Sequence, residues 1–205
     1  MKLIVFGPTG GTGRALVTQA LERGHRVTAF ARTPSKLGTS HANLTVIQGD
    51  VFDGASVQKA IAGHDAVLVA LGNSGLIKKD ETCSIGTRHI LAGMKAHGVK
   101  RLIVCSSMGV SESRQHIPAF VRFMLQRPLA DKDIQEADIR ASGLDYVIVR
   151  PTGLNDEPAR GELAVVEGGP LPTSRISRAD VAAFMLDQLV SDQYLGRAPG
   201  IGWKG

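Results

Sequence analysis

Short apolar runs alternate with longer amphipathic stretches along the whole chain. The apolar runs are rich in Val, Ile and Leu, as is usual for parallel strands that are buried on both faces. They predict strands over Lys2–Phe6, Arg26–Ala31, Leu44–Gln48, Ala66–Leu71, Arg101–Cys105 and Tyr146–Val149. The amphipathic stretches predict helices over Thr12–Arg23, Ala55–Ala62, Thr82–His97, Asp131–Ser142 and Arg178–Leu189. This alternation predicts the α/β class, as a Rossmann-type, doubly wound parallel sheet with helices on both faces.

The chain has 205 residues, a length that fits a single domain over 1–205. The irregular segments are Asn73–Glu81, Met108–Pro118 and Pro151–Ser174, which follow predicted strands directly or nearly so. Because ligands of open α/β sheets bind at the carboxyl ends of the strands, these segments are expected to form the substrate site. The alternative is that they are only solvated loops. The apolar segment Ala119–Leu125 is interpreted as a core helix or a lid rather than as a membrane contact.

A glycine-rich loop joins the first predicted strand to the first predicted helix. Gly7 suits the tight turn, Gly10 allows a diphosphate to approach the backbone, and Gly13 lets the helix pack closely. The N–H groups at the helix start stabilise phosphate charge. No Lys followed by Ser or Thr occurs in the run, which disfavours an ATP-type loop. The loop residues expected to bind a dinucleotide are Gly7, Thr9, Gly10, Gly11, Thr12 and Gly13.

The residues after the second predicted strand favour NADP(H) over NAD(H). An NAD-binding site usually places a carboxylate there, on the ribose hydroxyls. This chain has no Asp or Glu between Glu22 and Asp50, and the strand is followed by Arg32, Thr33 and Lys36. Two cations and a hydroxyl suit a phosphate monoester, which an Arg binds through its planar guanidinium. The alternative is a solvated basic turn.

Three later strand ends supply weaker candidates for the cofactor site. Asp50 and Val51 follow the third strand, where an Asp can bind the adenine amine; a turn or helix-start role is the alternative for Asp50. Leu71 and Gly72 follow the fourth strand, where a small residue lets the backbone pass beside the cofactor. The fifth strand ends at Cys105-Ser106-Ser107. Ser106 is expected at the cofactor and Ser107 at the substrate or nicotinamide, a turn serine being the alternative. Cys105 is interpreted as a core residue.

Together these segments resemble the atypical short-chain dehydrogenase/reductase group, most closely the biliverdin reductase B/flavin reductase proteins. The resemblance covers nearly the whole chain. It is carried by Phe6–Gly13, Gly49–Val51, Met94–Val99, Ser142–Val147, Arg150-Pro151 and Ile176–Asp180. It implies an NADPH-dependent reductase of flavins or related planar conjugated acceptors. A second branch, the NmrA-like proteins, implies an NADP-binding redox sensor without turnover.

The resemblance also implies roles for residues in the later segments. It places Arg32 and Lys36 near the 2′-phosphate, Ser107 near the nicotinamide, and the loop of Pro151, Thr152, Gly153 and Leu154 along the nicotinamide. Lys132 matches the lysine of the wider superfamily and is a candidate catalytic residue.

The chain departs from its relatives at two places. Pro128 stands where the superfamily tyrosine is usual, so the Tyr-x-x-x-Lys pair is missing. Gly153 stands where the biliverdin reductase B proteins carry a His. Reducing a simple ketone needs an oriented proton donor. A conjugated ring system spreads the new charge, so solvent can protonate it. The missing tyrosine therefore favours flavin-like acceptors over alcohols or sugars.

Composition narrows the partners. The net charge is +5, but the basic residues are scattered and aromatic residues make up only 4% of the chain, which is poor material for stacking bases. We therefore expect a small-molecule substrate and no nucleic acid. No apolar stretch has the roughly 20 residues of a membrane helix. Two cysteines are too few for a disulfide framework or metal cage, which fits a cytoplasmic protein without a metal site. A monomer or weak homodimer is expected.

Overall fold

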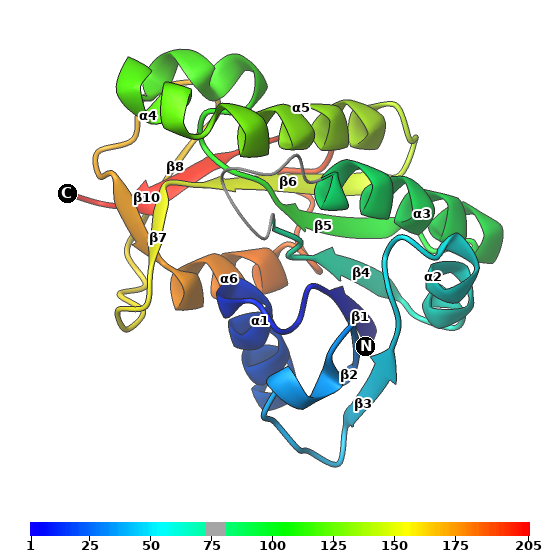
Figure 1. Cartoon of the computed structure of the whole chain (residues 1–205). Helices are drawn as coiled ribbons and strands as arrows, with labels where there is room; N and C mark the ends of the chain where they lie inside the picture. Colours follow the sequence, from blue (N-terminus) through cyan, green and yellow to red (C-terminus); the bar gives the residue numbers. More distant parts are fainter. Residues whose placement is uncertain (73–80) are drawn as a thin grey trace.

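The structure is a computed structural model that describes residues 1–72 and 81–205. Within them, the strands that form an eight-stranded sheet lie in the order β3-β2-β1-β4-β5-β6-β10-β8 (Figure 1). These strands are β1 (Lys2–Phe6), β2 (Arg26–Ala31), β3 (Leu44–Gln48), β4 (Ala66–Val69), β5 (Arg101–Cys105), β6 (Asp145–Pro151), β8 (Leu163–Val166) and β10 (Gly200–Trp203). All neighbours pair in parallel except β10 and β8, which are antiparallel. The Rossmann-type parallel sheet is confirmed.

The helices cover both faces of this sheet, as Figure 1 shows. Helices α1 and α6 pack together on one face; α2, α3 and α5 pack in a row on the other. Their bounds are α1 (Gly11–Glu22), α2 (Gly54–Ile61), α3 (Thr82–His97), α5 (Gln126–Arg140) and α6 (Arg178–Asp187).

Alternate residues of the central strand β1 point into two separate hydrophobic cores, because successive side chains of a strand point to opposite faces. Leu3 and Val5 belong to the core beneath α1 and α6. Ile4 and Phe6 belong to the core beneath α2 and α3. All four side chains are fully buried. The two cores hold the carboxyl end of β1, where the glycine-rich loop begins, in the middle of the molecule.

The C-terminal part of the chain contains more regular structure than the sequence predicts. The segment 151–174, expected to be irregular, contains β7 (Gly153–Asn155) and β8, and β7 pairs in parallel with β9 (Arg175–Ser177). The strand β10 was also not predicted. Its sequence is Gly-Ile-Gly-Trp, with two residues of low strand propensity, and it is formed by pairing with β6 and β8.

Two helix predictions need correction. Helix α5 begins at Gln126 rather than at Asp131. The apolar segment 119–125 is not a core helix: α4 (Ala119–Met124) has no buried residue, and the side chains of Phe120 and Phe123 are largely exposed. Apolar composition alone cannot tell a buried helix from one that tertiary packing leaves outside. Within the described residues, no helix is both long and apolar enough to cross a bilayer.

A candidate dinucleotide site at the carboxyl ends of the strands

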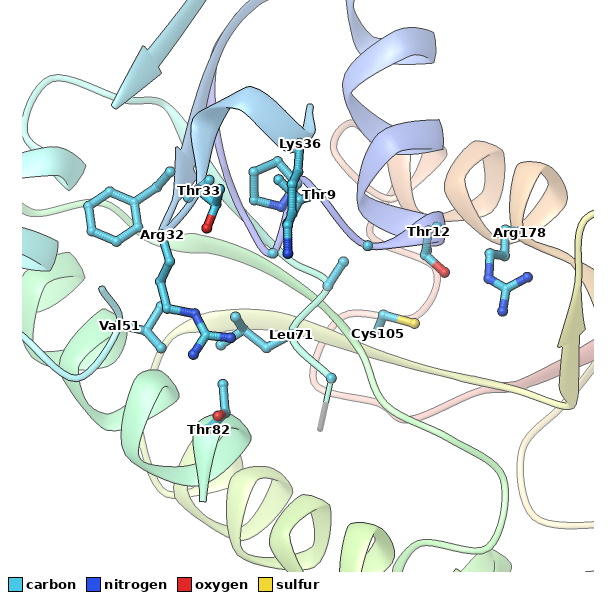
Figure 2. Close-up of a pocket in the computed structure, with 18 of the residues that line it drawn as sticks. Thr9, Thr12, Arg32, Thr33, Lys36, Val51, Leu71, Thr82, Cys105 and Arg178 are labelled. Atoms are coloured by element: carbon cyan, nitrogen blue, oxygen red, sulfur yellow. The ribbon is translucent and has the colours of Figure 1, made fainter. Parts of the chain in front are cut away.

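A cavity of about 900 Å³ opens at the carboxyl ends of the central strands. Its walls come from the β1–α1 loop, the ends of β2, β4 and β5, the segment after β3, the starts of α3 and α6, and single residues of α5 and β7. Figure 2 shows these side chains around one hollow. The cavity lies where the strand order reverses between β1 and β4, which is the usual ligand site of doubly wound sheets.

The β1–α1 loop lies close to its neighbours at two glycines. Gly7 has a φ of +79°, a left-handed conformation that favours glycine, and a Cβ at this position would collide with the carbonyl of Ala70 at the end of β4. A Cβ on Gly13 would collide with the carbonyl oxygen of Gly7, so Gly13 lies beneath the loop rather than in the cavity wall. These contacts fix the path of the loop along the cavity.

Gly10 differs from these two glycines because it has free space on its cavity side. The nearest atom to a Cβ built there is the Gly7 carbonyl oxygen at 3.6 Å, and Gly10 itself lines the cavity. It is also the N-cap residue of α1, and among the described residues no side chain caps this helix. The first N–H groups of α1 are therefore available to an anion, and the helix dipole favours negative charge at this end.

Arg32, Thr33 and Lys36 lie together at one end of the cavity (Figure 2). They follow β2, and a short 3-10 helix over Pro34–Lys36 turns the chain there. Arg14 of α1 donates a 2.9 Å hydrogen bond to the backbone oxygen of Lys36, which ties this turn to the glycine-rich loop's own helix. The predicted basic cluster is thus part of the cavity rather than a detached surface turn.

The opposite wall is built at the end of β5. Lys132 of α5 donates a 3.0 Å hydrogen bond from Nζ to the carbonyl oxygen of Cys105. The hydroxyl of Ser106 donates to Glu136 at 2.6 Å, and that of Ser107 donates to the carbonyl of Met108 at 3.0 Å. Both serines and Lys132 line the cavity. Their hydroxyl oxygens and the ammonium group are the polar groups that this wall offers to a ligand.

Cys105 is a core residue, as expected, although its sulfur side also reaches the cavity wall. Burial raises the pKa of its thiol, and the positive charges of Lys132 and Arg178 only partly oppose that effect. The thiol therefore stays protonated near neutral pH and is a poor nucleophile.

Most of the predicted site residues come together in this cavity. Those that line it are Gly7, Thr9, Gly10, Gly11, Thr12, Arg32, Thr33, Lys36, Val51, Leu71, Gly72, Ser106, Ser107, Lys132 and Leu154. Five others do not line it: Gly13, Asp50, Pro151, Thr152 and Gly153. The Asp50 carboxylate accepts a 3.1 Å hydrogen bond from the Phe52 amide, which is the alternative turn role. Thr152 and Gly153 donate backbone hydrogen bonds to β10 and to Ser174.

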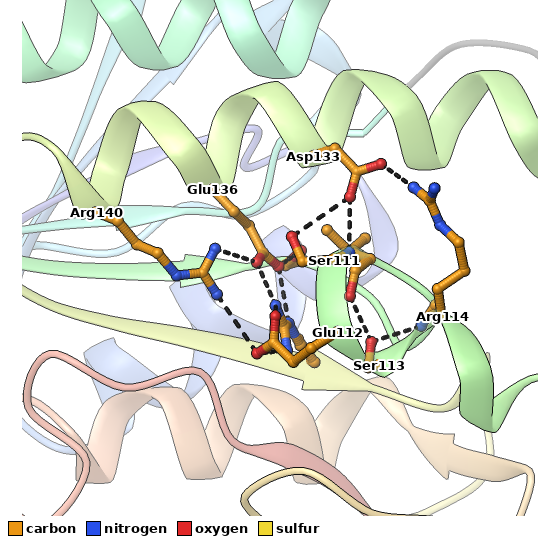
Figure 3. Close-up of polar contacts among 11 residues, drawn as sticks. Ser111, Glu112, Ser113, Arg114, Asp133, Glu136 and Arg140 are labelled. Atoms are coloured by element: carbon orange, nitrogen blue, oxygen red, sulfur yellow. Dashed lines mark hydrogen bonds and ion pairs between the residues drawn. The ribbon is translucent and has the colours of Figure 1, made fainter.

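The three predicted substrate loops have different positions. Residues 73–80 lie outside the described residues. Among the described residues, the segment 151–174 contributes Leu154 to the cavity and 108–118 contributes none. The segment 108–118 instead contains a short 3-10 helix over Ser111–His116, in which the Ser111 hydroxyl and the Arg114 guanidinium donate hydrogen bonds to Asp133 of α5 (Figure 3). A role of 108–118 at the substrate stays a prediction.

The cavity also contains residues that the sequence did not single out for it, among them Pro8, Phe30, Ala31, Gly49, Ala70, Thr82, Cys105 and Arg178. Phe30, Gly49 and Ala70 flank strand ends already assigned to the site, so strand position was a usable signal for them. Arg178 is different, because it lies far along the chain at the first position of α6. Only the packing of α6 on α1 brings it to the glycine-rich loop.

The profile of the NAD(P)H-binding family matches residues 7–192, from the first glycine of the loop to beyond α6. The chain belongs to this family. Membership of this family supports a nicotinamide cofactor, and the cavity, with an uncapped helix start and a glycine that leaves room for a ligand, is the candidate site for it.

Comparison with individual proteins agrees with membership of the NAD(P)H-binding family. The chain is 30% identical to reductase pytE of Aspergillus terreus over 94% of both chains. It is 28% identical to a Rossmann-fold NAD(P)-binding protein of Shigella flexneri, with a TM-score of 0.81 over 100% of this chain and 94% of that one. ChuY, an anaerobilin reductase of Escherichia coli O157:H7, shares the fold at 22% identity, with a TM-score of 0.86 over 98% and 96% of the two chains.

Proposed function

We propose that this protein is an NADPH-dependent reductase that transfers hydride to a flavin or a similar planar conjugated acceptor. One observation carries the proposal. Among the described residues that line the cavity there are four cationic side chains, Arg32, Lys36, Lys132 and Arg178, and neither a carboxylate nor a tyrosine. Such a lining favours a ligand with several negative charges and lacks a phenolic proton donor.

The cationic end favours NADPH over NADH. The 2′-phosphate of NADPH carries up to two negative charges, and a guanidinium binds a phosphate through paired hydrogen bonds. Arg32 and Lys36 supply the positive charge, and the hydroxyl of Thr33 supplies a further donor. No carboxylate of the described cavity wall opposes a phosphate. An NAD-binding site needs the reverse arrangement, with an acid on the ribose hydroxyls.

The opposite wall suits a conjugated acceptor. NADPH, when bound, supplies the hydride, and the protein holds the two ring systems at reacting distance. Ser107 offers a hydroxyl oxygen, and the Lys132 ammonium stabilises negative charge that develops on the acceptor's heteroatoms. Leu71 and Leu154 provide apolar surface in the same cavity. We take the proton to come from water, because the described wall contains neither a carboxylic acid nor a phenol.

Two relatives support a reductase. The A. terreus protein is named a reductase, and ChuY is described as an anaerobilin reductase. Each match covers at least 94% of this chain and of the relative. Their names place hydride transfer, rather than sugar chemistry, foremost among the activities to test.

The test is NADPH oxidation by the purified protein with FMN, FAD and quinones offered in turn. We expect turnover with at least one of these acceptors, and its loss in Gly10→Val, which removes the diphosphate space. Oxidation only with simple ketones or sugars would contradict the proposal. Tight NADPH binding without turnover on any acceptor would contradict the reductase and favour the non-catalytic NADP sensor.

A further inference from the structure

Arg178 lies at the end of the cavity opposite Arg32 and Lys36 (Figure 2). Its side chain crosses the start of α1. A Cβ built on Gly11 would collide with Cδ of Arg178 and would lie 2.6 Å from its Nε. The guanidinium group therefore lies directly over the first turn of α1, where the N–H groups are uncapped.

The backbone of Arg178 is firmly held beside α1. Ser177 caps α6, and its Oγ accepts a 3.0 Å hydrogen bond from the Asp180 amide. The Asp180 carboxylate in turn accepts a 2.7 Å hydrogen bond from the buried Trp203 indole. Gln19 of α1 donates to the carbonyl oxygen of Ala179 at 2.9 Å. The start of α6 is thus anchored on both sides, and the freedom at position 178 lies in the side chain.

The side chain itself is paired at the surface. Nη1 of Arg178 donates to Asp156 at 2.7 Å, and the side chains of the two residues are 28% and 83% exposed. Ion pairs this exposed contribute little to stability. A guanidinium has five N–H donors, and Asp156 accepts from one nitrogen. An anion seated on the first turn of α1 would compete for this cation with an exposed carboxylate that water already solvates well.

We infer that Arg178 is a diphosphate-binding residue, which exchanges its ion pair with Asp156 for the nucleoside diphosphate linkage of the dinucleotide. The inference rests on the proposed function and adds a second anion contact, remote from the 2′-phosphate end. Arg178 acts on the part that NADPH and NADH share. Its effect on the two cofactors is therefore equal, whereas the effect of Arg32 is confined to NADPH.

The test compares the binding of three probes, NADPH, NADH and 2′-AMP, by calorimetry on the full chain. Arg178→Met keeps the aliphatic cover over Gly11 and removes the charge. This variant should bind NADPH and NADH more weakly by the same factor, about tenfold or more, and its affinity for 2′-AMP should be unchanged. Arg178→Lys, which keeps the positive charge, should lose less dinucleotide affinity than Arg178→Met. Asp156→Asn should tighten both dinucleotides by about twofold to fivefold, because the competing charge is gone.

Wild-type affinity of Arg178→Met for both dinucleotides would overturn the inference, as would a loss confined to NADPH. If Arg178→Met does not fold, Arg178→Lys and Asp156→Asn decide: unchanged dinucleotide binding in both contradicts the exchange. Failure of the wild-type protein to bind NADPH would instead overturn the proposed function. That result is separate from any difference among the variants.

Discussion

Ser106 donates a 2.6 Å hydrogen bond from Oγ to Oε1 of Glu136, a carboxylate with no exposed side-chain surface. The same carboxylate accepts two hydrogen bonds from Arg150 of β6, at 3.0 and 2.5 Å. The Glu112 carboxylate accepts two more from that guanidinium, at 2.6 and 3.1 Å (Figure 3). A buried charge network thus holds the serine wall of the cavity against α5 and β6. A change that breaks this network should therefore affect both the stability of the fold and the shape of the cavity.

We expect Glu136→Ala to destabilise the fold by about 3–5 kcal/mol, because it leaves the buried Arg150 with only part of its compensating charge. The matched control is Asp138→Ala on the same helix, whose ion pair with Arg88 is partly exposed. That change should reduce the free energy of unfolding by at most about 1 kcal/mol. Denaturant unfolding measures both. Equal losses of unfolding free energy in the two variants would mean that the buried network stabilises the fold no more than the Arg88–Asp138 ion pair does.

Acid should weaken the outer part of this network. The hydrogen bond from Arg150 is the main reason that the pKa of Glu112 falls to about 2 from its ordinary 4.5. A folded-state pKa below the unfolded one means that the stabilisation is complete above pH 4.5 and is lost as the pH falls towards 2. Glu112→Gln should therefore be less stable than wild type at neutral pH, and the difference should shrink below pH 4. The free energies of unfolding of both proteins, measured across this pH range, test this prediction. A difference that stays constant with pH would contradict it.

Arg32→Ala should weaken NADPH binding by about tenfold to a hundredfold and leave NADH binding nearly unchanged, because a charge-assisted contact to the 2′-phosphate is lost. The control is Arg26→Ala, an exposed residue at the opposite end of the same strand. It should change neither affinity. Calorimetric titration of both cofactors decides, and equal losses for NADPH and NADH at position 32 would remove Arg32 from the phosphate site.

Two glycines of the loop should respond to substitution in opposite ways. Gly10→Val should fold normally and lose dinucleotide binding, because position 10 lines the cavity and a Cβ built there has only an ordinary contact, with the Gly7 carbonyl oxygen at 3.6 Å. Gly13→Ala should destabilise the protein, because its Cβ collides with the Gly7 carbonyl. Thermal unfolding and NADPH titration separate the two effects. Normal NADPH binding by Gly10→Val would show that the diphosphate lies elsewhere.

Catalysis should not depend on a tyrosine. Neither Tyr146 nor Tyr194 lines the cavity: Tyr146 packs against the core of α2 and α3, and the ring of Tyr194 lies 5.8 Å from that of Phe184. Both Phe variants should keep most of the flavin-reducing rate. Ser107→Ala and Lys132→Ala should lower it by about tenfold through positioning and electrostatics. Steady-state kinetics with NADPH and FMN test all four variants. A large loss of rate in a folded tyrosine variant would contradict this prediction and would favour simple carbonyl substrates.

The features that the sequence determined are local ones. The strand β1, the glycine spacing that follows it and the start of α1 form one continuous segment, so chain order alone sets their geometry. The ends of four predicted helices are also local features. Each is followed by a glycine with positive φ, as expected for a residue that ends a helix: Gly24, Gly63, Gly98 and Gly143. Arg32 and Lys36 reach the cavity because the carboxyl ends of parallel strands share one edge.

The tertiary structure alone decided which helices pack together and which charged side chains become buried. Arg178 meets Gly11 only because α6 packs on α1, and no periodicity in either helix encodes that pairing. Glu136 and Arg150 look like ordinary surface charges in the sequence, yet they form a buried pair beneath Ser106. Conversely, the apolar helix α4 looks like a core element in the sequence, yet it has no buried residue. Local patterns specify what an element is, whereas burial depends on which other elements pack against it, and that is a property of the assembled fold.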